Sequence, residues 1–282
     1  MKKLIITGDD FGISLPANEA VEEAHLRGIL NCASLMVGAK ATDDAVQRAK
    51  RLPTLNVGLH LVLVDGTSLL PPHEIPGLVD KEGQLSSRLV LSGIRFFCRR
   101  SVRRQLEAEI RAQFEAFQKT GLNLDHVNTH HHMHLHPTVL KLVLKAGRDY
   151  GMKALRFPYE PPWPSWHASQ KGLPRKLLLR LLLFPWLALL KNRLEGARIH
   201  SNQFLFGLND SGNMHLDLVL RFFEYLPRGV TEIYFHPVLP HIDLEKEDSD
   251  CGKEYRALTN PQLRQILLAS GIQQIAFSDL GK

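Results

Sequence analysis

Cysteine is scarce in this chain of 282 residues, and the cysteines present form no recognisable pair. Cys32, Cys98 and Cys251 lie far apart, their number is odd, and none belongs to a CxxC motif. The sequence therefore shows neither a disulfide framework nor a cysteine-based zinc site, which is typical of proteins in a reducing compartment. We expect a cytoplasmic protein.

Long apolar runs are missing as well. In the first residues, MKKLIITGDDFG, only four uncharged residues separate the lysines from Gly8, too few for a secretory signal, and they predict a strand. The longest apolar segment, residues 176–191, has about 14 apolar positions interrupted by Arg180 and Pro185, whereas a membrane-spanning helix needs about 20. Two interpretations stay open: a buried or lid helix, and a basic-flanked helix that makes peripheral contact with the inner membrane face through residues 176–190.

A strong charge of one sign is also absent. The chain has 35 basic and 29 acidic residues, for a net charge of +6. The basic residues gather locally, at 99–104 and at 171–191, and form no long stripe. We therefore expect no nucleic-acid partner.

Short β-rich runs alternate with helical patterns along the chain. Strands are expected at 3–7, 30–37, 55–63, 122–129, 153–158, 230–235 and 272–277. Helices are expected at about 14–28, 41–51, 102–120, 137–150 and 260–269. This alternation, without repeats or a clear linker, predicts one α/β domain over residues 1–282 with a parallel sheet, either barrel or open. We expect a deformed (β/α) TIM-barrel-like fold with a Leu-, Pro- and Trp-rich helical lid inserted at about 159–200.

Polar residues follow four of the expected strands, each just where the strand ends. They are the pair Asp9–Asp10, His60, the histidine run that begins at His130, and His236. In a (β/α) barrel the carboxyl ends of the strands converge on one mouth, where catalytic groups lie. Residues distant in sequence are therefore expected to meet in one site.

One carboxylate and two imidazoles suit a divalent ion while leaving positions open for water and substrate. Such an ion lowers the pKa of bound water and polarises a carbonyl, so the set favours metal-assisted hydrolysis. Each of these polar groups, taken alone, also has a purely structural interpretation. The aspartate pair could cap a helix, His60 could be a hydrogen-bonded core histidine, and His236 could simply close a strand. Their joint occurrence at strand ends argues for a site.

The run NTHHHMHLHP at 128–137 places five histidines within seven residues. His130 and His134 would share one face of a helix, which would suggest a self-contained metal pair. Pro137, however, is typical of the first turn of a helix, so residues 130–136 are expected to be a loop. A ligand from another strand, His60, is then favoured over His134.

Four segments, TGDDFGIS, VGLHL, VNTHHHMH and YFHP, resemble in order and spacing the motifs of the YdjC-like carbohydrate deacetylases. The resemblance covers nearly the whole chain and implies a metal-dependent enzyme with a barrel-like α/β fold. The segments ASLMVGAKATDDAV, LHLVLVDG and LLPPHEIPGLVDKEG are similar to the hopanoid-biosynthesis-associated branch of that family. That branch is associated with removal of an N-acetyl group from a glucosamine carried on a hopanoid lipid.

Carried over residue by residue, the resemblance assigns roles at the four strand ends. Asp10, His60 of GLH and His130, the first histidine of the triple, would be the metal ligands. Asp9 would match the family's proposed base, and His236 of the HP motif its proposed acid. By resemblance the ion is Mg²⁺, whereas two imidazoles favour Zn²⁺ or another transition metal.

Four further residues, Asn128, His132, His134 and Arg156, are expected beside the ligands or the substrate. VNTHHH stands where relatives often have LDSHHH, so Asn128 replaces an acidic residue. This difference puts in doubt a carboxylate role at that position.

The expected activity is removal of the N-acetyl group from an N-acetylglucosamine-type sugar linked to a hopanoid lipid. Two alternatives stay open. The first is a soluble chito-oligosaccharide deacetylase, and the second is a metal- or sugar-binding barrel without turnover, because a fold alone does not determine function. The sequence also leaves open whether the chain forms a homo-oligomer.

Overall fold

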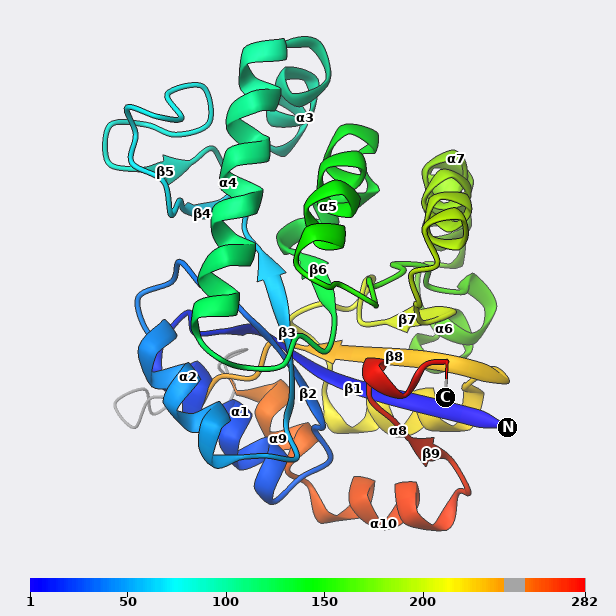
Figure 1. Cartoon of the computed structure of the whole chain (residues 1–282). Coiled ribbons are helices and arrows are strands. Elements are labelled where there is room, and N and C mark those ends of the chain that lie inside the picture. Colours follow the sequence, from blue (N-terminus) through cyan, green and yellow to red (C-terminus); the bar gives the residue numbers. More distant parts are fainter. Residues whose placement is uncertain (241–251, 282) are drawn as a thin grey trace.

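The computed structural model describes residues 1–240 and 252–281 (Figure 1), so Cys251 lies outside the described residues. Six strands form a parallel sheet in the order β6-β3-β2-β1-β8-β7, and β9 pairs with β1. These strands are β1 (Lys2–Phe11), β2 (Cys32–Leu35), β3 (Asn56–Leu61), β6 (Val127–Thr129), β7 (Phe204–Phe206), β8 (Gly229–Phe235) and β9 (Gln273–Gln274). A separate antiparallel pair comprises β4 (Gly66–Thr67) and β5 (Gln84–Leu85).

Helices surround the sheet, and α4, α5 and α7 stand next to one another above it in Figure 1. The α-helices are α1 (Leu15–Leu26), α2 (Thr42–Arg51), α3 (Leu89–Cys98), α4 (Arg100–Lys119), α5 (Pro137–Asp149), α6 (Pro162–Ser169), α7 (Leu173–Ala197), α8 (Leu216–Tyr225), α9 (Lys253–Leu258) and α10 (Pro261–Ala269). Two 3₁₀ helices are η1 (His130–Leu135) and η2 (Phe277–Asp279).

Local sequence explains the central elements. Strand β1 is buried through Leu4, Ile5 and Ile6, as expected for a strand of a parallel sheet covered on both faces. Helix α1 begins after Ser14, whose hydroxyl accepts a hydrogen bond from the Ala17 amide. Pro137 opens α5, where its missing N–H costs no helical hydrogen bond.

The sheet is a half-barrel, and residues 153–159 bridge its remaining side. Val127 pairs with Leu155 and Ala154 pairs with His200 through isolated parallel bridges. The strand expected at 153–158 is therefore reduced to single bridges. At Phe157 the side-chain amide of Asn202 replaces a strand partner: it accepts from the Phe157 N–H at 2.7 Å and donates to the Phe157 carbonyl at 2.8 Å. The α/β fold with a parallel, deformed barrel-like sheet agrees with the sequence prediction.

Three other expectations need correction in detail. The strands expected at 122–129 and 272–277 are shorter, and form only β6 and β9. The histidine run, expected to be a loop, forms η1, although His131 and His132 have positive φ values that interrupt it.

Residues 159–200, the expected insertion, form mainly α6 and α7. Helix α7 continues through Pro185 and is anchored at its start by Lys176, whose ammonium donates to the Ser165 hydroxyl at 2.6 Å and to the Ser169 hydroxyl at 2.8 Å. Within residues 1–240 and 252–281, no helix combines the length and apolar character needed to cross a membrane.

Candidate metal centre

Two consecutive aspartates reach the same site because β1 is irregular at its carboxyl end. The register of β1 against β2 shifts between Gly8 and Phe11, and Asp10 has a φ of 61°. Neighbouring residues of a regular strand point to opposite faces, whereas a bulge re-aims one of them. The left-handed conformation is uncommon for residues other than glycine, but aspartate tolerates it better than most.

Three side chains from separate parts of the sheet converge beside this bulge. The Oδ1 atom of Asp10 lies 3.3 Å from Nε2 of His60 and 3.5 Å from Nδ1 of His130, and these two nitrogens lie 3.3 Å apart. Asp10 comes from β1, His60 from β3, and His130 from the start of η1. These are the three residues expected to bind a metal, and their donor atoms lie close enough to share one ion.

The chemistry of this triad fits a divalent cation. Oδ1 of Asp10 is buried and accepts no hydrogen bond of normal geometry, although buried polar atoms are nearly always paired. Burial lowers the pKa of His60 to about 4, so its ring is neutral at pH 7, the form that binds metals. Burial opposes ionisation of Asp10, but the neighbouring His130 and His60 lower the pKa of its carboxyl.

Asn128 sets the tautomer of His60. Its Oδ1 lies 2.7 Å from His60 Nδ1, so that nitrogen donates and Nε2 keeps its lone pair towards Asp10. The amide orientation follows from its other end, where Nδ2 donates to Asp9 at 3.1 Å and to Ser34 at 2.9 Å. Hydrogen bonds of this kind orient ligating histidines in metal sites. Asn128 thus lies behind a candidate ligand, as expected.

A hydrogen-bond chain continues from Asn128 into the interior. The Ser34 hydroxyl lies 3.0 Å from Nε2 of His126, whose Nδ1 donates to Asp125 at 2.9 Å. Gly58 makes room for this chain, because a Cβ atom there would lie 2.5 Å from the His126 ring. The sequence analysis missed Ser34, His126 and Asp125; the glycine in VGLHL was the one available signal, and only the structure explains it.

Asp9 does not lie free beside the ligands. Arg156, fully buried, donates through Nη1 to Oδ2 of Asp9 at 2.5 Å and through Nη2 to Oδ1 at 2.9 Å. The same guanidinium donates to Glu232 at 2.7–3.1 Å. Burial would raise the pKa of Asp9, but Arg156 holds it well below its usual range. Arg156 was expected near the site, whereas Glu232 was not singled out.

The other histidines of the run have separate surroundings. His131 is exposed and lies 3.1 Å from Asp65. His132 lies 3.5 Å from the Tyr234 hydroxyl, and burial holds the pKa of its ring well below the usual value. His134 is fully buried and pairs with the Thr129 hydroxyl at 2.8 Å, which ties η1 to the end of β6. His134 therefore holds η1 to β6, whereas the His132 ring lies beside Tyr234.

His236 directly follows β8, as expected. Its ring packs edge-on against Tyr234, with the ring centroids 5.5 Å apart, and its backbone N–H donates to Glu254 at 2.5 Å. It is close enough to Asp9 and Asp10 to contribute to lowering the pKa of both carboxyls. The structure therefore brings all five principal residues of the sequence prediction to one side of the sheet.

An apolar cleft of about 570 Å³ opens next to the histidine run. Ile94 and Phe97 of α3 and Trp186 of α7 line it, and it extends to His131 and His132. His136 also lines the cleft, and its ring lies between those of Phe96 and Phe97. An apolar ligand in this cleft would lie next to the candidate metal site.

Two carbohydrate deacetylases are similar to this chain over nearly its whole length. A carbohydrate deacetylase of Brevibacillus brevis is 38% identical over 99% of this chain and 100% of its own length. A carbohydrate deacetylase of Vibrio cholerae serotype O1 is 29% identical over 99% of this chain and 96% of its own.

A solved structure shares the fold. It is that of a candidate cellobiose-phosphate cleavage protein from Enterococcus faecalis V583, which superimposes with a TM-score of 0.75 at 23% identity and covers 100% of this chain and 99% of its own. A family model described as YdjC-like protein matches residues 3–269. The chain therefore belongs to the YdjC-like protein family.

Proposed function

We propose that this chain is a carbohydrate deacetylase, a hydrolase that uses a divalent metal ion to cleave the amide bond of an N-acetylated sugar. The observation that carries the proposal is the convergence of one carboxylate oxygen and two imidazole nitrogens at 3.3–3.5 Å from one another. The carbohydrate deacetylases among its relatives support the substrate class.

Asp10, His60 and His130 would hold the ion, and the remaining polar groups would handle protons. When bound, the ion would polarise the acetamide carbonyl and lower the pKa of water. The proton of the attacking water would pass to Asp9, which Arg156 and Asn128 hold in position. The hydroxyl adds to the acyl carbon, the C–N bond breaks, and His236 protonates the nitrogen. The products are acetic acid, which ionises to acetate, and a free amine; Asp9 returns its proton to solvent, and His236 takes up a proton from solvent.

For the ion we propose Zn²⁺ or another transition metal in preference to Mg²⁺. Imidazole nitrogens suit Zn²⁺ and other transition metals, whereas Mg²⁺ prefers oxygen ligands. A donor set of two imidazoles and one carboxylate therefore favours a transition metal. The test strips the protein with a chelator and adds back single metals. Full acetate release with Mg²⁺ alone, and none with Zn²⁺, would contradict this choice.

Variants of the triad test the metal assignment directly. Asp10→Asn, His60→Ala and His130→Ala should each lose bound metal and acetate release, and asparagine suits position 10 because it tolerates the positive φ there. His73→Ala is the matched control, because His73 is exposed. Metal content by elemental analysis is the readout; full occupancy in all three triad variants would overturn the assignment.

We further propose that the sugar is carried on a hopanoid-type lipid. The resemblance to the hopanoid-associated branch supports this, and so does the apolar cleft that leads to His131 and His132. The second candidate is a soluble chito-oligosaccharide substrate. Acetate release from N-acetylchitobiose and from an N-acetylglucosaminyl hopanoid separates the two.

The cleft also allows a sharper test with one pair of substitutions. Ile94→Ser combined with Trp186→Ser should lower kcat/KM for the lipid-linked sugar about tenfold or more, since each large apolar side chain contributes about 1.5–3 kcal/mol of burial. Turnover of N-acetylchitobiose should be unchanged. Equal effects on both substrates would count against a lipid in the cleft, and absence of acetate release from either substrate with any metal would favour a binding protein.

A further inference from the structure

The two helices that flank the apolar cleft expose large apolar side chains to solvent. On α3 these include Val90, Ile94 and Phe97, with exposures of 79%, 55% and 62%. On α7 they include Leu178, Leu182 and Trp186, which lie four residues apart on one side of the helix and have exposures of 45–60%. We call the exposed side of these two segments the α3–α7 face. Contiguous exposed apolar surface of this kind marks an interaction site.

The α3–α7 face lies at the mouth of the candidate metal site. Both helices line the cleft that reaches His131 and His132, and Pro137, the first residue of α5, lies in the same wall. In a β/α fold the helix N-termini lie near the carboxyl ends of the strands, where the site is. Figure 1 shows α3, α5 and α7 on the same side of the sheet. A partner that covers the α3–α7 face would therefore also lie against the entrance of the candidate metal site.

The segments that carry the face lack acidic residues. Residues 86–106, which include α3, contain six arginines and no aspartate or glutamate. Residues 170–194, which include most of α7, contain six lysines and arginines and again no acidic residue. The chain as a whole is far more balanced, with 35 basic and 29 acidic residues. The apolar face is thus embedded in positive charge.

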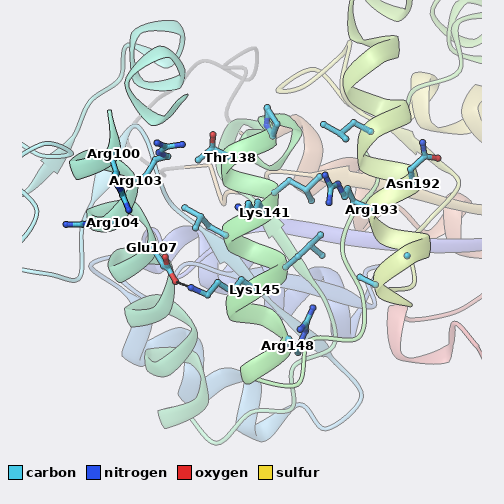
Figure 2. A pocket seen from close by; sticks show the side chains of 17 residues that line it. Arg100, Arg103, Arg104, Glu107, Thr138, Lys141, Lys145, Arg148, Asn192 and Arg193 are labelled. Atoms are coloured by element: carbon cyan, nitrogen blue, oxygen red, sulfur yellow. Dashed lines mark hydrogen bonds and ion pairs between the residues drawn. The ribbon is translucent and has the colours of Figure 1, made fainter. Parts of the chain in front are cut away.

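A basic groove continues from the apolar cleft, and Pro137 lines both. The groove has a volume of about 1120 Å³ and lies between α4, α5 and α7. Figure 2 shows Arg100, Arg103, Lys141 and Arg193 in its walls. Its one acidic lining residue, Glu107, pairs with Lys145 at 2.5 Å. The groove therefore presents positive charge that this carboxylate does not balance.

We propose that the α3–α7 face binds an anionic lipid bilayer, with its apolar side chains in the acyl boundary and the basic groove at the headgroup phosphates. Apolar side chains beside lysines and arginines are the signature of helices that lie in a membrane interface. A second copy of this chain fits poorly, because a symmetric contact would bring the same cations together. Nucleic acid would leave the apolar side chains exposed to water.

Bilayer binding does not depend on the proposed activity. It would place the mouth of the site against the membrane, so that a lipid-linked substrate could enter without leaving the bilayer, and only this consequence rests on the proposed function. The proposed membrane-binding surface is larger than residues 176–190, since it also includes α3 and the basic groove.

Sedimentation of the full-length protein with vesicles tests the proposal. Phosphatidylcholine vesicles are compared with vesicles that contain phosphatidylglycerol, at low and high salt. The wild-type protein should bind the anionic vesicles about tenfold or more tightly, with the difference falling as salt rises. The variants Leu178→Gln/Leu182→Gln/Trp186→Gln and Arg103→Gln/Lys141→Gln/Arg193→Gln should each lower binding about tenfold or more.

Matched controls separate this result from misfolding. Leu268→Gln changes an equally exposed leucine on α10, and Lys40→Gln/Lys50→Gln/Lys119→Gln removes three exposed cations elsewhere. Both controls should bind vesicles like the wild type, and all variants should keep its circular dichroism and melting temperature. Equal binding to both vesicle types overturns the proposal. It is likewise overturned if the wild-type protein is a dimer and the apolar variant dissociates it. Binding of duplex DNA without binding of vesicles would also overturn it.

Discussion

Asn128 contacts both a proposed metal ligand and the proposed base of the candidate site. Its carbonyl oxygen accepts from His60, a proposed ligand, and its NH₂ group donates to Asp9, the proposed base. Aspartate at this position would keep the first contact and lose the second, and would set a second negative charge beside Asp9. Arg156 already forms ion pairs with both Asp9 and Glu232. A neutral amide side chain at position 128 therefore suits the site better than a further carboxylate.

Substitution of Asn128 by leucine should weaken metal binding about 10–100-fold, because His60 loses the partner that fixes its tautomer. Leucine has the same number of side-chain heavy atoms with the same branching, so no cavity is expected, although the unpaired polar neighbours should cost about 1–3 kcal/mol of stability. Chelator competition measures the affinity, and chemical denaturation measures the stability. A variant with wild-type metal affinity would show that Asn128 does not orient the ligand.

Several elements whose apolar side chains face the core could be predicted from sequence, namely the central strand β1 and helices α1, α4 and α5. Helix α8 was missed although it also faces the core. Helix α3 was missed because most of its apolar residues face solvent, as Val90 illustrates. The strand at 153–158 was overpredicted because pattern alone cannot reveal that the side chain of Asn202 would take over strand pairing.

Lys176 should stabilise the packing of helix α7 against helix α6. Lys176→Met removes its hydrogen bonds to Ser165 and Ser169 while keeping a similar length, and should cost about 1–3 kcal/mol locally. Hydrogen exchange should therefore rise in α6 and the first half of α7 and stay unchanged in α1 and α2. Arg180→Met, at an exposed position on the same helix, is the control. Uniform exchange across the chain in both variants would argue against a local anchor.

For the whole molecule, the candidate ion site joins three strands. Asp10, His60 and His130 lie 50 and 70 residues apart in sequence. Asp10 and His60 nevertheless lie near the carboxyl ends of β1 and β3, and His130 directly follows β6, in a sheet whose order is β6-β3-β2-β1. Because parallel strands share one carboxyl edge, the sequence could predict this meeting of residues. It could not predict Ser34, His126, Asp125 or Glu232, since each lies within a buried region without a motif and gains its partner only through the sheet.

Metal binding should therefore stabilise the whole fold. At a free metal concentration of about 100 times Kd, the linkage contribution is about 2.7 kcal/mol. For a chain of this size, that should raise the melting temperature by about 5–10 °C. Differential scanning calorimetry of the chelated and metal-loaded protein measures the shift, with His60→Ala as the variant in which it should vanish. An identical shift in both proteins would place the ion elsewhere.

The hydrogen-bond chain that runs from Asn128 through Ser34 and His126 to Asp125 also contacts the C-terminal part of the described chain. Asp125, at its inner end, also accepts from the Ser278 amide at 2.9 Å, and the Phe277 ring stacks on His126 with centroids 4.5 Å apart. The last turn of the described chain is thus linked through Asp125, His126, Ser34 and Asn128 to His60. We expect a truncation or fusion that displaces residues 277–278 to disturb the orientation of His60, although it alters no proposed ligand and lies beyond the residues that the family model matches.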